Sequence, residues 1–285
     1  MENEFKKKLT RYIELALQED VGAGDFTTLS TIPQDKIAEA KLLVKEEGVL
    51  AGVEVAREIF QAVDPQFEID LVLQDGSWVK SGEVAFYLRG SIHQILLTER
   101  LVLNIMQRMS GIATETAKYA RKISHTKAKV LDTRKTTPLN RFLEKEAVKI
   151  GGGSNHRFGL YDMILIKDNH VDYSGGITSA LQNAFDYKTL NHLEIPIEIE
   201  VRNFEELREV LESKKVDRVM FDNFSPKDVA MAVQLVDGRL ITEASGGITL
   251  ETIAEYAEAG VDYISIGALT HSVKSLDLSL KAKLI

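Results

Sequence analysis

Basic side chains gather in residues 131–170 of a chain whose formal net charge is −8. They are Arg134, Lys135, Arg141, His156, Arg157 and Lys167. Some follow short apolar runs, as residues at strand ends do, and others follow a run of three glycines. A single Lys or Arg is more often part of a surface ion pair, but cations on strand ends and loops can converge on one pocket. The stretch therefore indicates a pocket for a small ligand with several negative charges.

The elements that must position these residues alternate between short apolar runs and amphipathic segments. Strands are expected at 128–131, 163–166, 195–201, 218–221, 240–243 and 263–266, and helices at 141–150, 177–185, 204–212, 226–236 and 250–259. Asn203 and Ser225-Pro226 are typical helix starts. The alternation predicts a parallel sheet and favours an α/β barrel, although the strand candidates do not require a regular eight-stranded one.

Glycines follow the last two of these strands. Ser245, Gly246 and Gly247 precede one helix candidate, and Gly267 follows the next strand. Bare backbone N–H groups near helix N-termini bind phosphate, and barrels often hold a phosphate at this position. Plain strand-to-helix turns would explain the glycines as well, but two consecutive loops of this kind favour a phosphate cradle. His271 follows as either a further donor or a polar residue at a domain junction.

Two carboxylates, Glu200 and Asp222, end the third and fourth strands. Carboxylates at barrel strand ends can bind Mg²⁺ through water, bond sugar hydroxyls, or stabilise a developing positive charge. They can also simply neutralise nearby cations. Lys167 ends the second strand and could form a Schiff base with a carbonyl substrate, although anion binding fits it at least as well.

The N-terminal part of the chain has an α+β pattern. Helices are expected at 5–17 and 55–63, strands at 38–44 and 49–53, β structure at 67–92, and a long helix at 93–123 interrupted by Ser110-Gly111. Arg100 and Arg108 lie in the apolar pattern of that helix, and side chains that reach out to solvent are favoured there over delivery to a pocket. The alternating tail 276–285 fits an edge strand of this domain. We expect one domain of residues 1–110 with 271–285, and a catalytic barrel of 111–270.

Composition excludes several classes of protein. Hydrophobic residues make up 44% and charged residues 27% of 285 residues, as in a globular protein with a sizeable core. Without cysteine there are no disulfides, thiolate metal sites or Cys nucleophiles. The N-terminus lacks the apolar core of a signal peptide, and no run is long enough to span a bilayer. We therefore expect a cytoplasmic protein without a nucleic-acid or membrane partner.

Motifs spread over nearly the whole chain closely resemble the quinolinate phosphoribosyltransferase family. They are TERLVLNIMQRMSGIAT, LDTRKTTP, GGGSNHRFGLYDMILIKDNH, IEIEV, FDN, EASGGIT and SIGALTH, in this order. The resemblance implies an α/β-sandwich-like N-terminal domain followed by an incomplete α/β barrel. It also implies a homodimer or larger homo-oligomer with shared active sites. The implied reaction joins quinolinate to phosphoribosyl pyrophosphate with Mg²⁺, and it yields nicotinate mononucleotide, pyrophosphate and CO₂ for NAD synthesis.

The same resemblance implies roles for individual residues. The quinolinate carboxylates would contact Arg134, His156, Arg157 and Lys167, with Arg100 supplied across the dimer. Lys135 would lie between the anionic groups of the two substrates, and Glu200 and Asp222 would face the ribose and its metal. The 5-phosphate would rest on Ser245, Gly246, Gly247 and Gly267, with His271 near the phosphates.

The chain departs from the family pattern at one turn. Family members often have Pro-Gly where this chain has Pro138-Leu139, which puts the turn before Arg141 in question. The sequence also leaves three different functions open. A related phosphoribosyltransferase-like protein could act on another acid or serve metal-oxyanion uptake, although the DTRK and NHR strings argue against it. The second is a Schiff-base aldolase that uses Lys167, and the third is a non-catalytic phosphosugar-binding module.

Overall fold

The computed structural model describes residues 2–284, and the chain falls into two compact units. The first comprises Met1–Glu115, Pro138–Gly152 and Ser272–Ile285, and the second comprises Thr116–Thr137 and Gly153–His271. Residues 138–152 thus group with the first unit, although the sequence placed them with the barrel. The reason is aromatic packing, because the Phe142 ring lies edge-on to those of Phe5 and Tyr12, with ring centroids 5.5 and 5.7 Å apart.

The first unit contains a four-stranded antiparallel sheet in the order β12-β1-β5-β3. Its strands are β1 (Ile37–Val44), β3 (Glu68–Leu71), β5 (Val84–Ser91) and β12 (Leu278–Leu284). Buried and exposed residues alternate along β1, so one face of the sheet is apolar. Helix α3 (Val53–Val63) packs against it, with the Phe60 and Phe86 ring centroids 5.9 Å apart. The tail strand β12 pairs with β1, and Leu278 lies opposite Val44.

Helix α4 (Ile92–Lys122) is continuous through Ser110 and Gly111, so the interruption expected there is wrong. These small residues allow close packing instead. The Ser110 hydroxyl accepts the Ala51 N–H at 2.9 Å. A side chain at Gly111 would collide with the backbone carbonyl of Lys274. Close approach of another segment, and not a helix break, explains this Ser-Gly pair.

The remaining described elements of the first unit are three helices and two short strands. They are α1 (Glu2–Val21), α2 (Phe26–Thr31), β2 (Gly48–Val49), β4 (Trp78–Val79) and α5 (Arg141–Ile150). Helix α2 begins directly after Asp25. Asp25 caps it by accepting the Thr28 N–H at 3.0 Å, which satisfies one of the free donors at the helix start.

The second unit is built on a six-stranded parallel sheet in the order β6-β11-β10-β9-β8-β7. The strands are β6 (Lys129–Leu131), β7 (Ile164–Ile166), β8 (Ile197–Val201), β9 (Arg218–Asp222), β10 (Ile241–Ser245) and β11 (Tyr263–Ser265). In a closed barrel β6 would also neighbour β7, but within residues 2–284 these two strands are not paired. Only one bridge, from Leu131 to Ser154, extends the sheet beyond β6 on this side. The incomplete α/β barrel is therefore confirmed.

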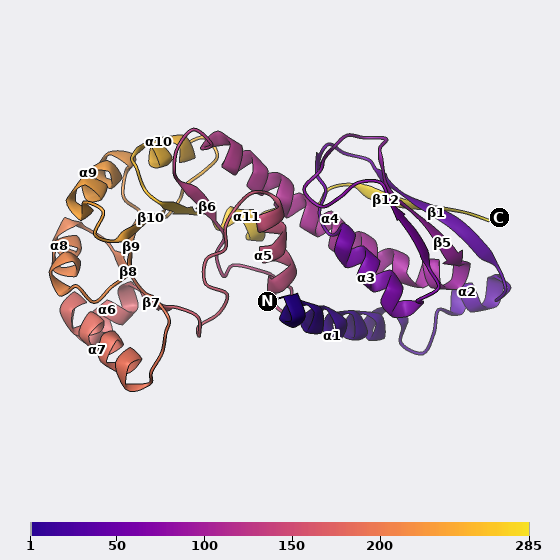
Figure 1. Cartoon of the computed structure of the whole chain (residues 1–285), viewed down its shortest axis with the longest axis horizontal. Coiled ribbons are helices and arrows are strands. Elements are labelled where there is room, and N and C mark those ends of the chain that lie inside the picture. Colours follow the sequence, from indigo (N-terminus) through magenta and orange to yellow (C-terminus); the bar gives the residue numbers. More distant parts are fainter. Residues whose placement is uncertain (1, 285) are drawn as a thin grey trace. The chain divides into compact units, whose positions relative to one another are not determined.

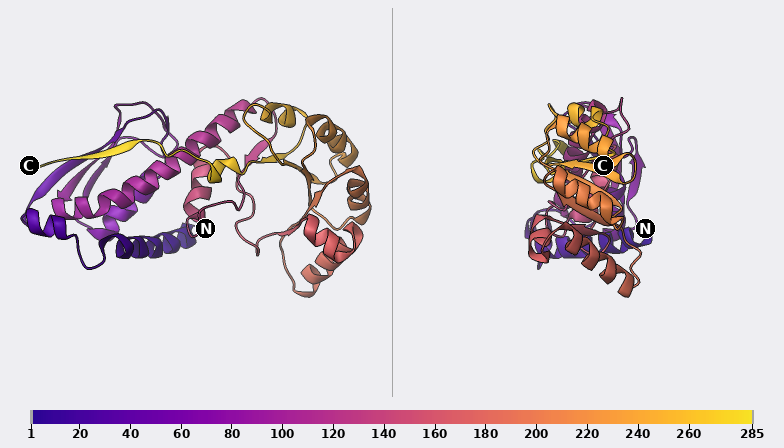
Figure 2. Two further views of the ribbon diagram at one scale, coloured as in Figure 1. Left: turned by 180° about the vertical axis from the view of Figure 1, so that it is seen from behind. Right: turned by 90° about the vertical axis from the view of Figure 1, so that its left-hand side faces the viewer.

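Helices cover the outer side of this sheet (Figures 1 and 2). They are α6 (Asp168–Ser174), α7 (Ile177–Leu190), α8 (Phe204–Ser213), α9 (Pro226–Val236) and α10 (Ile253–Glu258). The short helix α11 (Ala268–His271) instead follows the carboxyl end of β11. The two predicted caps are confirmed, since Asn203 accepts the Glu206 N–H and Ser225 accepts the Asp228 N–H. On the second unit, a cavity is lined by polar residues that follow these strands.

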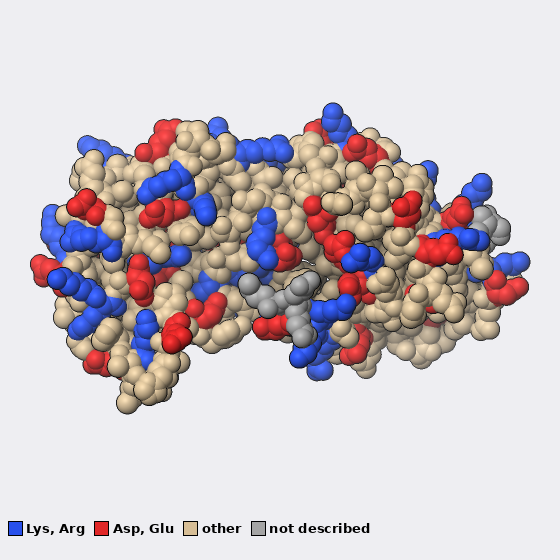
Figure 3. Space-filling model, viewed as in Figure 1, with Lys and Arg blue, Asp and Glu red and all other residues tan. Residues whose placement is uncertain are grey.

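Charges of both signs are interspersed on the face shown in Figure 3. Exposed ion pairs of the described residues include Lys127 with Asp262 and Lys274 with Glu46. Among the helices of residues 2–284, none combines the length and the apolar character needed to cross a membrane.

Candidate active site

One cavity of about 770 Å³ lies at the carboxyl ends of the barrel strands. It is lined by twelve of the residues singled out in the sequence: Arg134, Lys135, His156, Arg157, Lys167, Glu200, Asp222, Ser245, Gly246, Gly247, Gly267 and His271. Two expected cations are not among its lining residues. Arg100 is an exposed side chain on α4, and Arg141 begins α5. The strand-end rule for barrels therefore located most of this site.

Side chains hold the loop that carries Arg157. The Asp132 carboxylate accepts the His156 N–H at 2.9 Å, and the His156 Nδ1 atom accepts the Arg157 N–H at 2.7 Å. Asp162 accepts the next two N–H groups, those of Phe158 and Gly159, at 2.6 and 2.8 Å. Four successive N–H groups thus have side-chain acceptors in a loop without helix or strand bonds. This arrangement fixes the backbone from which the Arg157 side chain enters the cavity.

Positive charge concentrates on one wall of the cavity. Burial lowers the pKa of the Arg157 guanidinium, and the neighbouring Arg134 lowers it further. Two cations held close together repel each other until an anion joins them. This wall is therefore suited to a ligand with more than one negative charge.

The ion pair of Lys167 and Glu200 connects the cationic wall to an acidic wall, which Glu200 and Asp222 form. The Lys167 ammonium donates to Glu200 Oε2 at 3.1 Å, while the lysine side chain stays about half exposed to the cavity. Burial raises the pKa of the Glu200 carboxyl, and Lys167 opposes that rise. Asp222 lies on the next strand, where its carboxylate accepts the Asn223 side-chain amide at 2.7 Å. Both acids therefore have defined orientations toward the cavity.

Glycines permit close approach at the loops that follow β10 and β11. Gly246 has φ +100°, and a Cβ atom there would collide with the Asn223 side-chain amide. Gly247 also has a positive φ, +61°. A Cβ atom on Gly267 would lie 3.1 Å from His271 and 3.2 Å from the Lys135 side chain. The absence of side chains therefore exposes backbone N–H groups and lets Lys135 and His271 converge.

Lys135 is held through its own backbone. Its N–H donates to the Thr133 hydroxyl at 3.0 Å, and its carbonyl accepts the Thr270 hydroxyl at 2.7 Å. Thr270 is buried in α11, the short helix after the Gly267 loop. Thr270 was not recognised in the sequence because the pairing joins the two ends of the unit. It places Lys135 beside the glycine loop.

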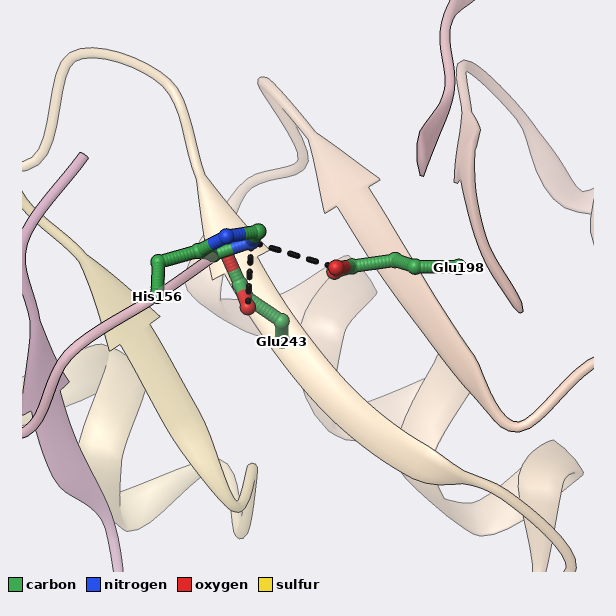
Figure 4. Close-up of side chains that lie close together, drawn as sticks. All are labelled: His156, Glu198 and Glu243. Atoms are coloured by element: carbon green, nitrogen blue, oxygen red, sulfur yellow. Dashed lines mark ion pairs between the residues drawn. The ribbon is translucent and has the colours of Figure 1, made fainter. Parts of the chain in front are cut away.

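Two buried acids beside His156, one of which lines the cavity, were missed in the sequence (Figure 4). Glu198 and Glu243 are fully buried, and their Oε2 atoms lie 3.1 and 3.6 Å from His156 Nε2. Burial raises the pKa of both carboxyls to about 7. The alternation in IEIEV could have revealed Glu198, since it shares a strand face with Glu200. Glu243 gave no such signal.

The turn where the chain departs from the family pattern keeps a left-handed backbone. Leu139 has φ +65° and an 85% exposed side chain. This conformation suits glycine and is strained for leucine. Leu139 therefore adopts a backbone conformation that glycine takes more easily, and α5 still begins at Arg141.

The site combines an open barrel, a cationic wall, two oriented carboxylates and a glycine cradle. This combination is typical of an α/β-barrel protein that binds small phosphate-bearing anions. Models of the quinolinate phosphoribosyl transferase N-terminal and C-terminal domains match residues 25–110 and 112–281. These matches cover most of the chain. The chain belongs to the quinolinate phosphoribosyl transferase family.

Relatives extend over nearly the full chain. A chloroplastic nicotinate-nucleotide pyrophosphorylase [carboxylating] of Arabidopsis thaliana is 46% identical over 96% of this chain and 82% of its own length. A probable nicotinate-nucleotide pyrophosphorylase [carboxylating] of Bacillus subtilis is 44% identical over 98% of this chain and 93% of its own length. NadC from Streptococcus pyogenes has a similar structure, with a TM-score of 0.91 and 37% identity over 96% of both chains. The structure of the nicotinate-nucleotide pyrophosphorylase from Francisella tularensis is also similar, with a TM-score of 0.90 and 39% sequence identity. The match covers 98% of this chain and 97% of that one.

Proposed function

We propose that this protein transfers the phosphoribosyl group of phosphoribosyl pyrophosphate to quinolinate, with loss of CO₂. The products are nicotinate mononucleotide and pyrophosphate, and the reaction serves NAD synthesis. Family membership supports this reaction. The observation that carries it is that Arg134, Arg157 and Lys167 line the same cavity as the Ser245 loop. A dicarboxylate and a phosphosugar can therefore meet there.

The cationic wall is suited to the pyridine dicarboxylate. Arginine binds a carboxylate through two parallel hydrogen bonds and so fixes the orientation of the ring. Arg134 and Arg157 would act in this way, with Lys167 as a third positive group. Holding the ring nitrogen near the anomeric carbon supplies much of the acceleration, because orientation replaces a search in solution.

The glycine cradle and the two acids are suited to the phosphosugar. The 5-phosphate would accept N–H groups of the Ser245-Gly246-Gly247 and Gly267 loops, with His271 nearby. Lys135 would lie between the anionic groups of both substrates. Glu200 and Asp222 would stabilise the positive charge that develops on the ribose.

A magnesium ion fits the acidic wall. Mg²⁺ prefers oxygen ligands, keeps several waters, and is usually held by one or two carboxylates together with substrate phosphates. Glu200 and Asp222 offer such oxygens on neighbouring strands, without the full set of ligands that would hold a metal alone. When bound, the ion would neutralise the charge of the departing pyrophosphate.

The bond changes require neither a protein nucleophile nor a redox partner. The ring nitrogen attacks the anomeric carbon, and the bond from that carbon to the pyrophosphate oxygen breaks. The ring is then cationic, so the carbon next to nitrogen can accept the electron pair as its carboxylate leaves as CO₂. A proton from solvent then completes the ring. The protein contributes orientation and charge.

The same proposal includes a homodimer or larger homo-oligomer, in which Arg100 of one subunit completes the site of another. Its support is the family resemblance together with the exposure of Arg100. A cytoplasmic location is likewise part of the proposal.

The contacts in the cavity give less support to two other functions. A Schiff-base enzyme needs an amine with a free lone pair, whereas the Lys167 amine donates to Glu200. Borohydride trapping with a carbonyl substrate tests this directly, and we expect no adduct. A related transferase for a different acid shares the cavity, and only a substrate comparison separates it.

The decisive experiment measures CO₂ and nicotinate mononucleotide from quinolinate, phosphoribosyl pyrophosphate and Mg²⁺. Nicotinate replaces quinolinate in a parallel reaction as the specificity control. We expect product from quinolinate alone. Turnover of nicotinate without turnover of quinolinate would replace the proposed substrate, and ligand binding without pyrophosphate release would indicate a non-catalytic binding protein.

A further inference from the structure

Asn223 directly follows β9 and has a left-handed backbone, with φ +56°. Five non-glycine residues within residues 2–284 have a positive φ, and Asn223 is the one of them that lines the cavity. Lys214 and Asp237 instead end helices, where a left-handed residue is common. Elsewhere this conformation persists where the surroundings hold it, as they often do at active sites. The backbone of Asn223 therefore points to a role in the cavity.

Contacts on both sides of Asn223 hold this turn. Its N–H donates to the Ser245 carbonyl at 2.9 Å, which continues the pairing of β9 with β10 by one residue. The next carbonyl, that of Phe224, accepts the Tyr256 hydroxyl at 3.0 Å. The Phe224 ring is buried, and its centroid lies 5.5 Å from that of Phe221. The chain thus turns from β9 into α9 with Asn223 fixed beside the end of β10.

The Asn223 side chain contacts two parts of the site. Its amide nitrogen donates to Asp222 Oδ2 at 2.7 Å. Its amide oxygen faces Gly246, where an added Cβ atom would collide with it. The carboxylate favours this orientation of the amide, because an amide oxygen turned toward Asp222 would meet a second acceptor. One side chain therefore touches both an acid of the cavity and the glycine loop.

The residue type follows from these contacts. Glycine would adopt the left-handed backbone more easily than asparagine, but it has no amide. Aspartate tolerates this backbone and has a similar shape, but it has no N–H for Asp222 and would place a second negative charge beside it. Asparagine combines a left-handed backbone with a donor for the neighbouring carboxylate.

We propose that Asn223 is a positioning residue that couples Asp222 to the loop of Ser245, Gly246 and Gly247. It orients the carboxylate that would face the ribose, and it sets how closely the loop that would hold the 5-phosphate approaches that carboxylate. This inference rests on the proposed function and adds to it a residue that acts through two neighbouring groups.

Two substitutions at Asn223 separate the amide from the backbone. Asn223→Gly and Asn223→Ala both remove the amide, but alanine is strained at φ +56° and glycine is not. In calorimetric titrations with Mg²⁺, we expect both variants to raise the Kd for phosphoribosyl pyrophosphate about tenfold, the effect of one lost hydrogen bond to a charged group. The Kd for quinolinate should stay unchanged. The melting temperature should be lower for Asn223→Ala than for Asn223→Gly.

The matched control is Asp237→Gly, which changes a left-handed residue with φ +50° at the other end of α9. Both Kd values should equal those of the parent. If Asn223 acted through the stability of the turn alone, Asn223→Gly would bind phosphoribosyl pyrophosphate as the parent does, and that result would overturn the proposal. An equal loss of affinity for quinolinate would overturn it as well, because the coupling concerns the phosphosugar side of the cavity.

A double substitution tests the coupling to the loop. The methyl group of Gly246→Ala meets the Asn223 side chain, and Asn223→Gly removes the side-chain atoms that it meets. Residues in contact have non-additive effects, so the combined loss of affinity for phosphoribosyl pyrophosphate should be smaller than the product of the two single losses. A combined loss equal to that product or larger would show that Asn223 and the loop act independently.

Failure of the proposed function gives a separate result. A parent protein that forms no nicotinate mononucleotide from quinolinate overturns the proposed function. The role of Asn223 is decided by Kd values, which do not depend on turnover.

Discussion

The ammonium of Lys167 donates to Glu200 Oε2 at 3.1 Å, and so joins the ends of the adjacent strands β7 and β8. Each group neutralises the other before substrates arrive. An incoming carboxylate would compete with Glu200 for Lys167. The pair thereby couples the quinolinate side of the cavity to the ribose side.

Glu200→Gln is expected to separate binding from catalysis. Removing the competing carboxylate leaves Lys167 free for quinolinate, so the Kd for quinolinate should stay equal or fall. The charge that stabilises the ribose transition state is lost, and kcat should fall about a hundredfold. Calorimetric titration and steady-state kinetics measure the two effects. Glu258→Gln, at a surface ion pair, serves as the control, and weaker quinolinate binding in Glu200→Gln would contradict the coupling.

Arg134→Ala should impair the binding of one substrate far more than the other. It removes a carboxylate clamp worth about 2 kcal/mol, or about thirtyfold in affinity. We expect that loss for quinolinate, with binding of phosphoribosyl pyrophosphate nearly unchanged. Titration of each ligand separately provides the comparison. Equal losses for both ligands would show that Arg134 does not face the dicarboxylate.

Gly246→Ala should weaken both the fold and phosphosugar binding. The backbone has φ +100°, and the added methyl group would collide with the Asn223 side chain. We expect a loss of about 1 to 3 kcal/mol in the free energy of unfolding, together with a higher KM for phosphoribosyl pyrophosphate. Gly238→Ala is the control for backbone strain alone, since φ is +67° there and no atom lies within 4 Å. A Gly246→Ala enzyme that matches this control would show that the close approach to Asn223 has no energetic effect.

Burial of Glu243 predicts a pH-dependent cost to stability. Its pKa rises to about 7 in the folded state from 4.5. The folded protein therefore holds more protons than the unfolded chain between these values, and stability falls as the pH rises through this window. Glu243→Gln removes the ionisation, so its stability relative to the parent should increase between about pH 5 and about pH 8. Denaturant unfolding at the two pH values measures this difference, and a difference that does not change with pH would contradict it.

Shared sites predict complementation between inactive subunits. Arg100→Ala and Lys135→Ala should each reduce turnover strongly when present alone. Mixed oligomers contain sites that receive Arg100 from one subunit and Lys135 from the other, so part of the activity should return. Mass spectrometry verifies that mixed oligomers have formed. If they form and stay inactive, Arg100 does not act across subunits.

Much of the site was predictable because chemistry in a barrel collects at strand ends. Arg134, Lys167, Glu200 and Asp222 each follow a short apolar run, and the parallel sheet places these ends together. Helix caps were equally local, as at Ser225. In contrast, Ser110-Gly111 suggested a break but lies within a continuous helix, because its neighbours come from distant segments.

Residue types, strand periodicity and capping came from the sequence by itself, since they depend on neighbours within a few positions. The tertiary structure alone decided which buried groups meet. The approach of Glu198 and Glu243 to His156 joins segments far apart in the chain, and it puts two buried acids beside a histidine that lines the cavity. Such contacts arise from the packing of β8 beside β9 and β10, for which no local pattern exists.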